Sequence, residues 1–152
     1  WLTVGGMALG TAVAFLAGSV VARWPWALAM ALLSALMSPK LYGYPKVLTT
    51  AVAALLIVSC RELPTWRRVA LMSAWTAVAF LFRHDYAVYC AVGFLALIAL
   101  SGHAVWRDRI GRVAAYGVIT LVMLAPSFWW IQHYRGLTEY VRNAREMSAN
   151  AA

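Results

Sequence analysis

The chain alternates between long uncharged stretches and short polar turns. The stretches without Lys, Arg, Asp, Glu or His are residues 1–22, 24–39, 47–60, 69–82, 86–106 apart from His103, and 113–132. A membrane-spanning helix needs about 20 predominantly apolar residues, with a range of about 17–25. The first and last stretches meet this length alone, and the middle ones meet it when flanking charged side chains extend to the membrane surface. The pattern predicts an all-α fold, a polytopic transmembrane bundle of about six hydrophobic helices.

Prolines and turn residues set the expected helix boundaries. We expect Pro25 and Pro45 to open helices, because proline is tolerated at the first helical position, and Pro64 to be placed for the same purpose. Asp85 is well placed as the N-cap of the fifth helix. The basic segment 107–112 is expected as a loop that leads into the last span.

The expected bundle covers residues 1–132, as part of a larger transmembrane domain. Four glycines of the first span favour close helix contact: Gly5, Gly6, Gly10 and Gly18. Residues 133–152 are expected to form an amphipathic segment at the membrane surface, because apolar residues recur there at helical spacing. Its apolar residues are Leu137, Tyr140, Val141 and Ala144, and its charged ones are Glu139, Arg142, Arg145 and Glu146. Since the chain opens on Trp1 within a span and has no folded terminator, we expect an internal part of a longer protein, with 133–152 leading into a missing region.

Composition excludes an ordinary soluble domain. Hydrophobic residues make up 64% of the chain, charged residues 12%, and the mean hydropathy is +0.73. This composition does not supply the polar exterior that a soluble domain of this size needs. The net charge of +8 is carried by Lys and Arg in the short connections, where they anchor helices to lipid headgroups. We therefore expect membrane lipid, and not nucleic acid, as the partner of these charges.

Alternation of the spans sorts the basic residues onto two sides. Seven lie on one side: Arg23, Arg61, Arg67, Arg68, Arg107, Arg109 and Arg112. Six lie on the other: Lys40, Lys46, Arg83, Arg135, Arg142 and Arg145. Seven against six does not decide the orientation by the positive-inside rule, which counts these residues. The second side also gathers acid, histidine and tyrosine in tight turns, a composition typical of a functional site.

The sharpest candidate site is the turn Arg83-His84-Asp85 at the lip of two hydrophobic stretches. Three ionisable residues there are costly unless water, a partner or a ligand meets them. The planar fork of arginine suits phosphate, because it donates two parallel hydrogen bonds. The structural alternative is that Arg83 extends to the membrane surface, Asp85 caps a helix and His84 fills the turn.

A second candidate is the turn from Lys40 to Lys46, expected on the same surface as Arg83. Its two lysines, with Tyr42 and Tyr44, suit a phosphate and a sugar ring, or else form an aromatic belt with membrane-anchoring lysines. The two cysteines, Cys60 and Cys90, give no disulfide or metal-ligand pattern. Glycine-rich phosphate loops, nucleophile elbows and paired carboxylates are absent, so no metal site and no cofactor are expected, and the need for a divalent metal stays open.

The order of these features resembles the bacterial polytopic glycosyltransferases of the dolichyl-phosphate-mannose protein mannosyltransferase type, which have the GT-C fold. The resemblance is carried by short motifs between Ser38 and Tyr140: Tyr44-Pro45-Lys46, Phe82-Arg83-His84-Asp85, Pro126 with its aromatic neighbours, and Tyr134-Arg135-Gly136. It implies an integral protein of the bacterial cytoplasmic membrane that transfers a sugar from a polyprenyl-phosphate carrier to an unidentified acceptor on the extracytoplasmic face.

The resemblance also implies roles for single residues. Arg83, with Lys40 and Lys46, is expected to bind the donor phosphate, and His84, Asp85, Tyr42 and Tyr44 to line the substrate side. The acidic catalytic residue of the family has no match here, so we expect it outside this chain and expect this part alone to be inactive. A transporter or flippase, which predicts internal repeats and broken helices, and a structural membrane subunit are the alternatives.

Overall fold

A computed structural model describes residues 2–36, 44–60, 63–101 and 105–134, with Gly136, Thr138, Glu139, Arg142, Asn143 and Glu146. Over these residues the chain is all-α and contains no strand, as predicted. The helices are α1 (Leu2–Val21), α2 (Trp24–Leu36), α3 (Tyr44–Val58), α4 (Trp66–Phe82), α5 (His84–Leu100) and α6 (Trp106–Tyr134).

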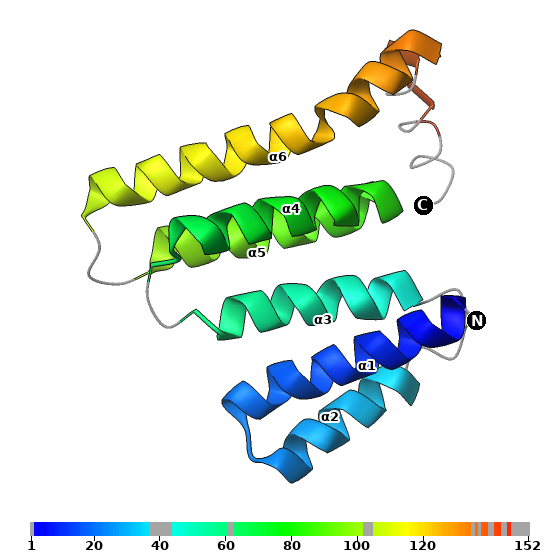
Figure 1. Ribbon diagram of the computed structural model, residues 1–152, viewed down its shortest axis with the longest axis vertical. Coiled ribbons are helices and arrows are strands. Elements are labelled where there is room, and N and C mark those ends of the chain that lie inside the picture. Colours follow the sequence, from blue (N-terminus) through cyan, green and yellow to red (C-terminus); the bar gives the residue numbers. More distant parts are fainter. Residues whose placement is uncertain are drawn as a thin grey trace.

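Each helix runs antiparallel to the one before it, so the bundle has two ends (Figure 1). At one end, named here the Arg23 end, α1, α3 and α5 finish and α2, α4 and α6 begin. At the other, named the Arg83 end, α3 and α5 begin and α4 and α6 finish. Helix α3 packs on α1 and also on α4 and α5, and so joins the first half of the bundle to the second. The start of α3 and the α4–α5 junction therefore share an end, as the alternation of spans predicts.

The prediction that Asp85 caps α5 is wrong. Helix α5 begins at His84, and Arg83 occupies the cap position with an extended backbone (φ −162°, ψ 138°). The Arg83 N–H donates to the Ala79 carbonyl at 2.9 Å, and the Ala87 N–H donates to the Arg83 carbonyl at 3.4 Å. Arg83 is thus both the C-cap of α4 and the N-cap of α5, and Asp85 lies within the first turn of α5.

The prediction of a loop over residues 107–112 is also wrong, because these residues form the first turns of α6. Arginine is a good helix former, and the charges of a helix end need only reach the surface, so the basic run continues the helix. Pro25 and Pro45 occupy the second helical position rather than the first. The N–H group has no intrahelical partner at either position, so proline, which lacks this group, is tolerated at both. Pro64 lies buried two residues before α4 instead of opening it.

Helix α6 continues through Pro126 to Tyr134. Gly136 follows with φ +76°, a left-handed conformation that glycine adopts without steric cost, and its N–H donates to the Ile131 carbonyl at 3.1 Å. The described tail residues Thr138, Glu139, Arg142, Asn143 and Glu146 are helical and exposed. The predicted apolar side of this segment lies outside the described residues, so its amphipathic character stays a prediction.

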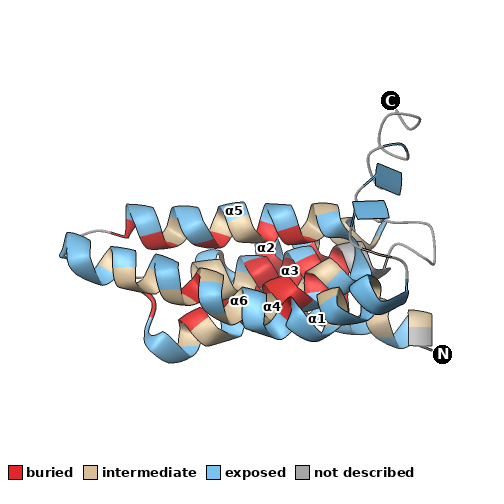
Figure 2. Cartoon of the chain, turned by 90° about the horizontal axis from the view of Figure 1, so that it is seen from above, coloured by how far each residue is buried: buried red, intermediate tan, exposed pale blue. Residues whose placement is uncertain are grey.

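Buried positions lie on the inward sides of the helices and exposed positions on their outward sides (Figure 2). Half of the buried hydrophobic residues of the described part are alanine, and most of its leucine and valine side chains are exposed. The buried alanines are Ala17, Ala27, Ala31, Ala51, Ala53, Ala77, Ala79 and Ala87. The exposed aliphatic residues include Leu9, Leu16, Leu32, Leu36, Leu71, Leu81, Val88, Val92, Leu100, Leu121 and Val122. Larger side chains are buried mainly between α4, α5 and α6, around Phe94, Met72 and Tyr116. Helices whose backbones approach closely through small residues are typical of membrane interiors.

Two of the four predicted contact glycines in α1 lie against a neighbouring helix. A Cβ atom added to Gly18 would lie 3.1 Å from the Cα atom of Ala27, and one added to Gly10 would lie 3.2 Å from the backbone nitrogen of Leu48. Gly5 has no such neighbour within 4 Å, so the expectation of a close contact there is wrong. Gly10 and Gly18 therefore set the distances from α1 to α3 and α2.

Among the described residues, two helices are long and apolar enough to cross a membrane, judged by length and composition. They are residues Thr3–Val21 of α1 and the whole of α6. The segments Trp24–Leu36, Val47–Val58 and His84–Leu100 are apolar but shorter.

We expect Gly18→Ala to lower the free energy of unfolding by about 1–3 kcal/mol, because Ala27 meets the new methyl with its backbone, which cannot move aside. The matched control is Gly5→Ala, whose methyl enters open space and which gains about 1 kcal/mol of helix propensity at most. Unfolding by titration with a denaturing detergent in mixed micelles measures both. Equal stability of the two variants would contradict this packing.

Candidate functional site

Arg83 and Asp85 form a bidentate ion pair within the α4–α5 junction. The Arg83 Nε donates to Asp85 Oδ1 at 3.0 Å, and Nη2 donates to Oδ2 at 2.9 Å. The side chains are 65% and 43% exposed, so the pair lies at the surface of the Arg83 end. The two parallel N–H donors of Arg83, which were expected to bind a phosphate, thus bind the neighbouring Asp85 carboxylate.

The surroundings of Arg83 favour its charged form. The hydrogen bond to Asp85 raises the pKa of the Arg83 guanidinium, and the charge of the same carboxylate and the Tyr86 side chain raise it further. The guanidinium carbon also lies 5.3 Å from the centre of the Tyr86 ring, within cation–π range. A guanidinium has five N–H donors, and Asp85 uses two of them. The remaining three N–H donors leave Arg83 able to bind a second anion beside Asp85.

A line of aromatic contacts links the junction to α6. The His84 ring meets Phe80 edge to face with centres 5.0 Å apart, and Phe80 meets Phe128 in the same way at 5.6 Å. Phe128 lies two residues after Pro126. His84 does more than fill the turn. Its ring packs on Phe80 near the end of α4, and Phe80 packs on Phe128 of α6.

The last turns of α6 carry a second aromatic group. Trp129 stacks on His133 with ring centres 5.8 Å apart, and Trp130 lies 4.3 Å from Tyr134. Both tryptophans are exposed. Such flat exposed rings suit the interface of a membrane and also the face of a sugar ring.

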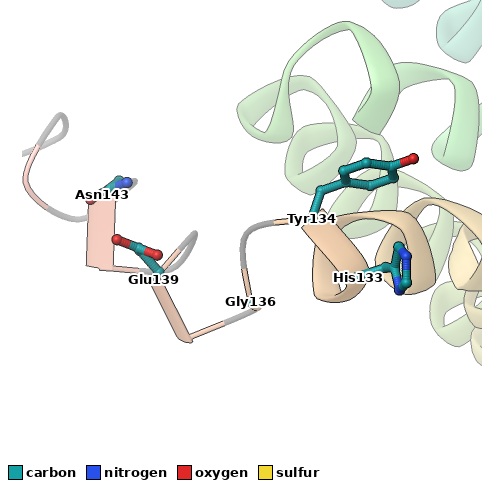
Figure 3. A pocket seen from close by; sticks show the side chains of 5 residues that line it. All are labelled: His133, Tyr134, Gly136, Glu139 and Asn143. Atoms are coloured by element: carbon teal, nitrogen blue, oxygen red, sulfur yellow. The ribbon is translucent and has the colours of Figure 1, made fainter.

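An open hollow of about 350 Å³ lies beyond this group (Figure 3). Its lining residues are His133, Tyr134, Gly136, Glu139 and Asn143. Figure 3 shows that the rings of His133 and Tyr134 point away from the Glu139 and Asn143 side chains, so the polar groups do not converge on one point. Glu139 instead pairs with Arg142 at 3.5 Å.

The other predicted site residues are only partly placed. Lys40 and Tyr42 lie outside the described residues. Tyr44 and Lys46 belong to the first turn of α3, at the Arg83 end, but their side chains lie outside the described part. The expected gathering of these four residues around Arg83 stays a prediction.

Cys60 and Cys90 are free thiols. In the part of the chain that the structure describes, no three His, Cys, Asp or Glu side chains are grouped so as to hold a metal ion. The site at the Arg83 end therefore consists of a guanidinium, a carboxylate, imidazoles and aromatic rings.

Sequence analysis missed a buried polar cluster that holds α4 against α6. The Thr76 and Tyr116 hydroxyls lie 2.6 Å apart, and Ser73 donates to the Tyr116 carbonyl at 3.2 Å. Ser73 and Thr76 are three residues apart, and Tyr116 is followed at helical spacing by Thr120, whose hydroxyl donates to the Tyr116 carbonyl at 2.7 Å. This spacing of polar residues within two apolar stretches is a signal that identifies the facing surfaces of two helices.

The chain matches no protein-family model, no curated protein and no solved structure. The function is therefore inferred from the geometry of the helices and of the Arg83 end.

We expect Tyr116→Phe and Thr76→Val to destabilise the bundle non-additively, because each removes one partner of the same hydrogen bond. Hydrogen bonds between membrane helices couple by about 0.6 kcal/mol on average and up to about 1.7 kcal/mol. A double-mutant cycle in mixed micelles measures this coupling. Tyr89→Phe, at an exposed position of α5, is the control and should leave stability unchanged. Strict additivity of the two core variants would show that the hydroxyls do not interact.

Proposed function

We propose that this chain is part of the transmembrane domain of a polytopic membrane protein. The observation that carries the proposal is that most leucine and valine side chains of the described part are exposed, while half of the buried hydrophobic residues are alanine. A water-soluble bundle buries its large apolar residues, and extended exposed apolar surface marks a partner or a lipid phase. Here every helix with described side chains except α3 carries large apolar residues with exposed side chains, and a lipid phase satisfies all of them at once.

Two sets of exposed aromatic residues support the same proposal. Trp24, Trp26, Trp66 and Trp106 lie at the Arg23 end, and Trp129, Trp130 and Tyr134 lie at the Arg83 end. On α6 the distance from Trp106 to Trp129 is about 35 Å at 1.5 Å per residue. The hydrocarbon core of a bilayer is about 30 Å thick, and tryptophan prefers its two boundaries.

The shorter helices fit this setting with some accommodation. Helices α4 and α5, each of 17 residues, extend for about 25 Å. Such lengths cross a bilayer when it thins locally or when flanking side chains extend to the surface. Helix α2, with 13 described residues, extends for about 20 Å and is proposed to start at the Trp24 boundary.

Within such a domain, we propose that the Arg83 end binds the phosphate of a polyprenyl-phosphate-linked sugar in a glycosyltransferase. Three features support this: the resemblance of the turn to that family, the surface guanidinium of Arg83, and the exposed rings of Trp129 and Trp130 at the same end. Arg83 would hold the donor and stabilise the charge that grows on the leaving phosphate. The proposed location is the extracytoplasmic side of a bacterial cytoplasmic membrane.

An enzyme is favoured over a transporter by the continuity of the helices. Transporter sites are typically built where helices are interrupted near the middle of the membrane. The six helices are each continuous over their stated bounds, α6 passing through Pro126, and the ionisable groups of the described part lie at helix ends.

We expect single cysteines at the two ends to label from opposite sides of the membrane. In a background with Cys60 and Cys90 replaced by serine, Glu139→Cys should react with an impermeant thiol reagent in intact cells. Arg107→Cys should react only after the cells are permeabilised, because it lies at the other end of the same bundle. Labelling of both from outside would contradict a spanning bundle with this orientation.

In the full-length protein, we expect Arg83→Ala to reduce sugar transfer from a polyprenyl-phosphate donor at least about tenfold, since charge-assisted hydrogen bonds to phosphate are lost. Arg83→Lys keeps the charge but loses the fork, so it should retain part of the activity. Arg142→Ala removes another exposed arginine at the same end, paired with Glu139, and should retain full activity. A folded Arg83→Ala variant with the parent's rate would reduce Arg83 to a membrane anchor.

A further inference from the structure

Three arginines of the Arg23 end, Arg68, Arg109 and Arg112, contact a neighbouring helix or the end of one. From the first turn of α4, Arg68 Nη1 donates to the Ser59 carbonyl at 3.0 Å, just past the end of α3. From the start of α6, Arg109 Nη1 donates to the Ala99 carbonyl at 3.2 Å, in the last turn of α5. Each reaches back from the start of one helix to the end of the helix before it, where carbonyl groups lack intrahelical partners.

Arg112 completes this arrangement. Its guanidinium carbon lies 5.5 Å from the centre of the Trp66 ring, so a residue of α6 lies over a residue of α4. The Nε atoms of Arg109 and Arg112 are buried and have no hydrogen-bond partner among the described residues. In the described part of the chain, neither of these guanidinium groups forms an ion pair with a carboxylate.

The two ends of the bundle differ in whether their arginines are paired with carboxylates. In the described part of the chain, both ion pairs lie at the Arg83 end, where Arg83 pairs with Asp85 and Arg142 with Glu139. The Arg23 end carries Arg23, Arg67, Arg68, Arg107, Arg109 and Arg112, with Asp108 as its described acid. The N-termini of α2, α4 and α6 add positive partial charge at the same end. The basic residues in the first turns of α4 and α6 oppose the helix dipoles, so an anion bound at this end would stabilise them.

We propose that the arginine face formed by Arg67, Arg68, Arg107, Arg109 and Arg112 binds the phosphate groups of anionic phospholipids. This inference rests on the proposed membrane setting. A lipid headgroup fits better than a soluble anion because Trp66 and Trp106 are exposed in the same turns, and Leu71 and Ile110 are exposed one turn further on. Aromatic and apolar side chains next to a fixed cation match a headgroup with its acyl chains below it. The arginine face therefore faces the anionic cytoplasmic leaflet.

The test uses the full-length protein in lipid nanodiscs that contain phosphatidylcholine and a rising fraction of phosphatidylglycerol. In a variant in which phenylalanine replaces every tryptophan except Trp66 and Trp106, quenching of fluorescence by brominated phosphatidylglycerol, compared with brominated phosphatidylcholine, reports which lipid lies beside these two residues. We expect enrichment of phosphatidylglycerol, lowered by about fivefold for each arginine removed. Arg67→Gln and Arg107→Gln are the main variants, because both side chains are exposed and their removal leaves the contacts of Arg68 and Arg109 intact. Arg142→Gln, at the opposite end, is the control.

The outcomes separate the lipid proposal from the membrane proposal. Protection from protease in the same preparation shows whether the bundle is inserted. An inserted protein without preference for phosphatidylglycerol overturns the lipid proposal alone, and so does an enrichment that inorganic phosphate abolishes or that Arg67→Gln and Arg107→Gln leave unchanged. A protein that does not enter the bilayer overturns both proposals.

Discussion

Close approach of helix backbones through small residues is the constraint on which this structure depends. In the membrane setting proposed above, a lipid phase offers no hydrophobic driving force for packing one apolar helix on another, so stability would come from contact area and hydrogen bonds. Gly18 against Ala27 and Gly10 against Leu48 bring α1 within backbone contact of α2 and α3. In the second half, the hydrogen bonds of the Ser73, Thr76 and Tyr116 hydroxyls fix the position of α4 along α6. The first half is thus positioned by shape and the second by hydrogen bonds.

The two ends of the bundle treat their charges differently. At the Arg83 end, arginine and carboxylate neutralise each other within one turn, and aromatic rings surround them. At the Arg23 end, arginines hold helix termini together and keep their net charge. An exposed ion pair adds little to stability. The pairing of Arg83 with Asp85 is therefore better explained by the charged groups that it displays at the surface than by a contribution to the stability of the fold.

Sequence reasoning predicted the helices well, because their length and apolar character are local properties. It placed Asp85 as a cap, since Asp is a frequent cap residue, but the extended backbone of Arg83 had already taken that position. It placed 107–112 in a loop because charge was equated with a turn, although arginine continues a helix. The counts of seven and six basic residues also concealed the asymmetry of the ends, because pairing with carboxylates depends on three-dimensional position.

The partners of buried polar groups were the least predictable part. Thr76 and Tyr116 are 40 residues apart, and their contact depends on how α4 and α6 rotate about their axes. The regular placement of Trp24, Trp66 and Trp106 at the starts of α2, α4 and α6 is a clearer signal. It marks one common surface of the bundle before any contact is known.

The single-residue junction at Arg83 limits how the second half of the bundle can move. Sliding α5 past α4 by one helical turn requires about 5.4 Å of additional chain. A residue that is already extended supplies at most about 3.6 Å in total, so the junction has no slack. Helices α4 and α5 therefore cannot slide past each other by a full turn, and a change in their relative position has to come from a change in the angle between them at Arg83.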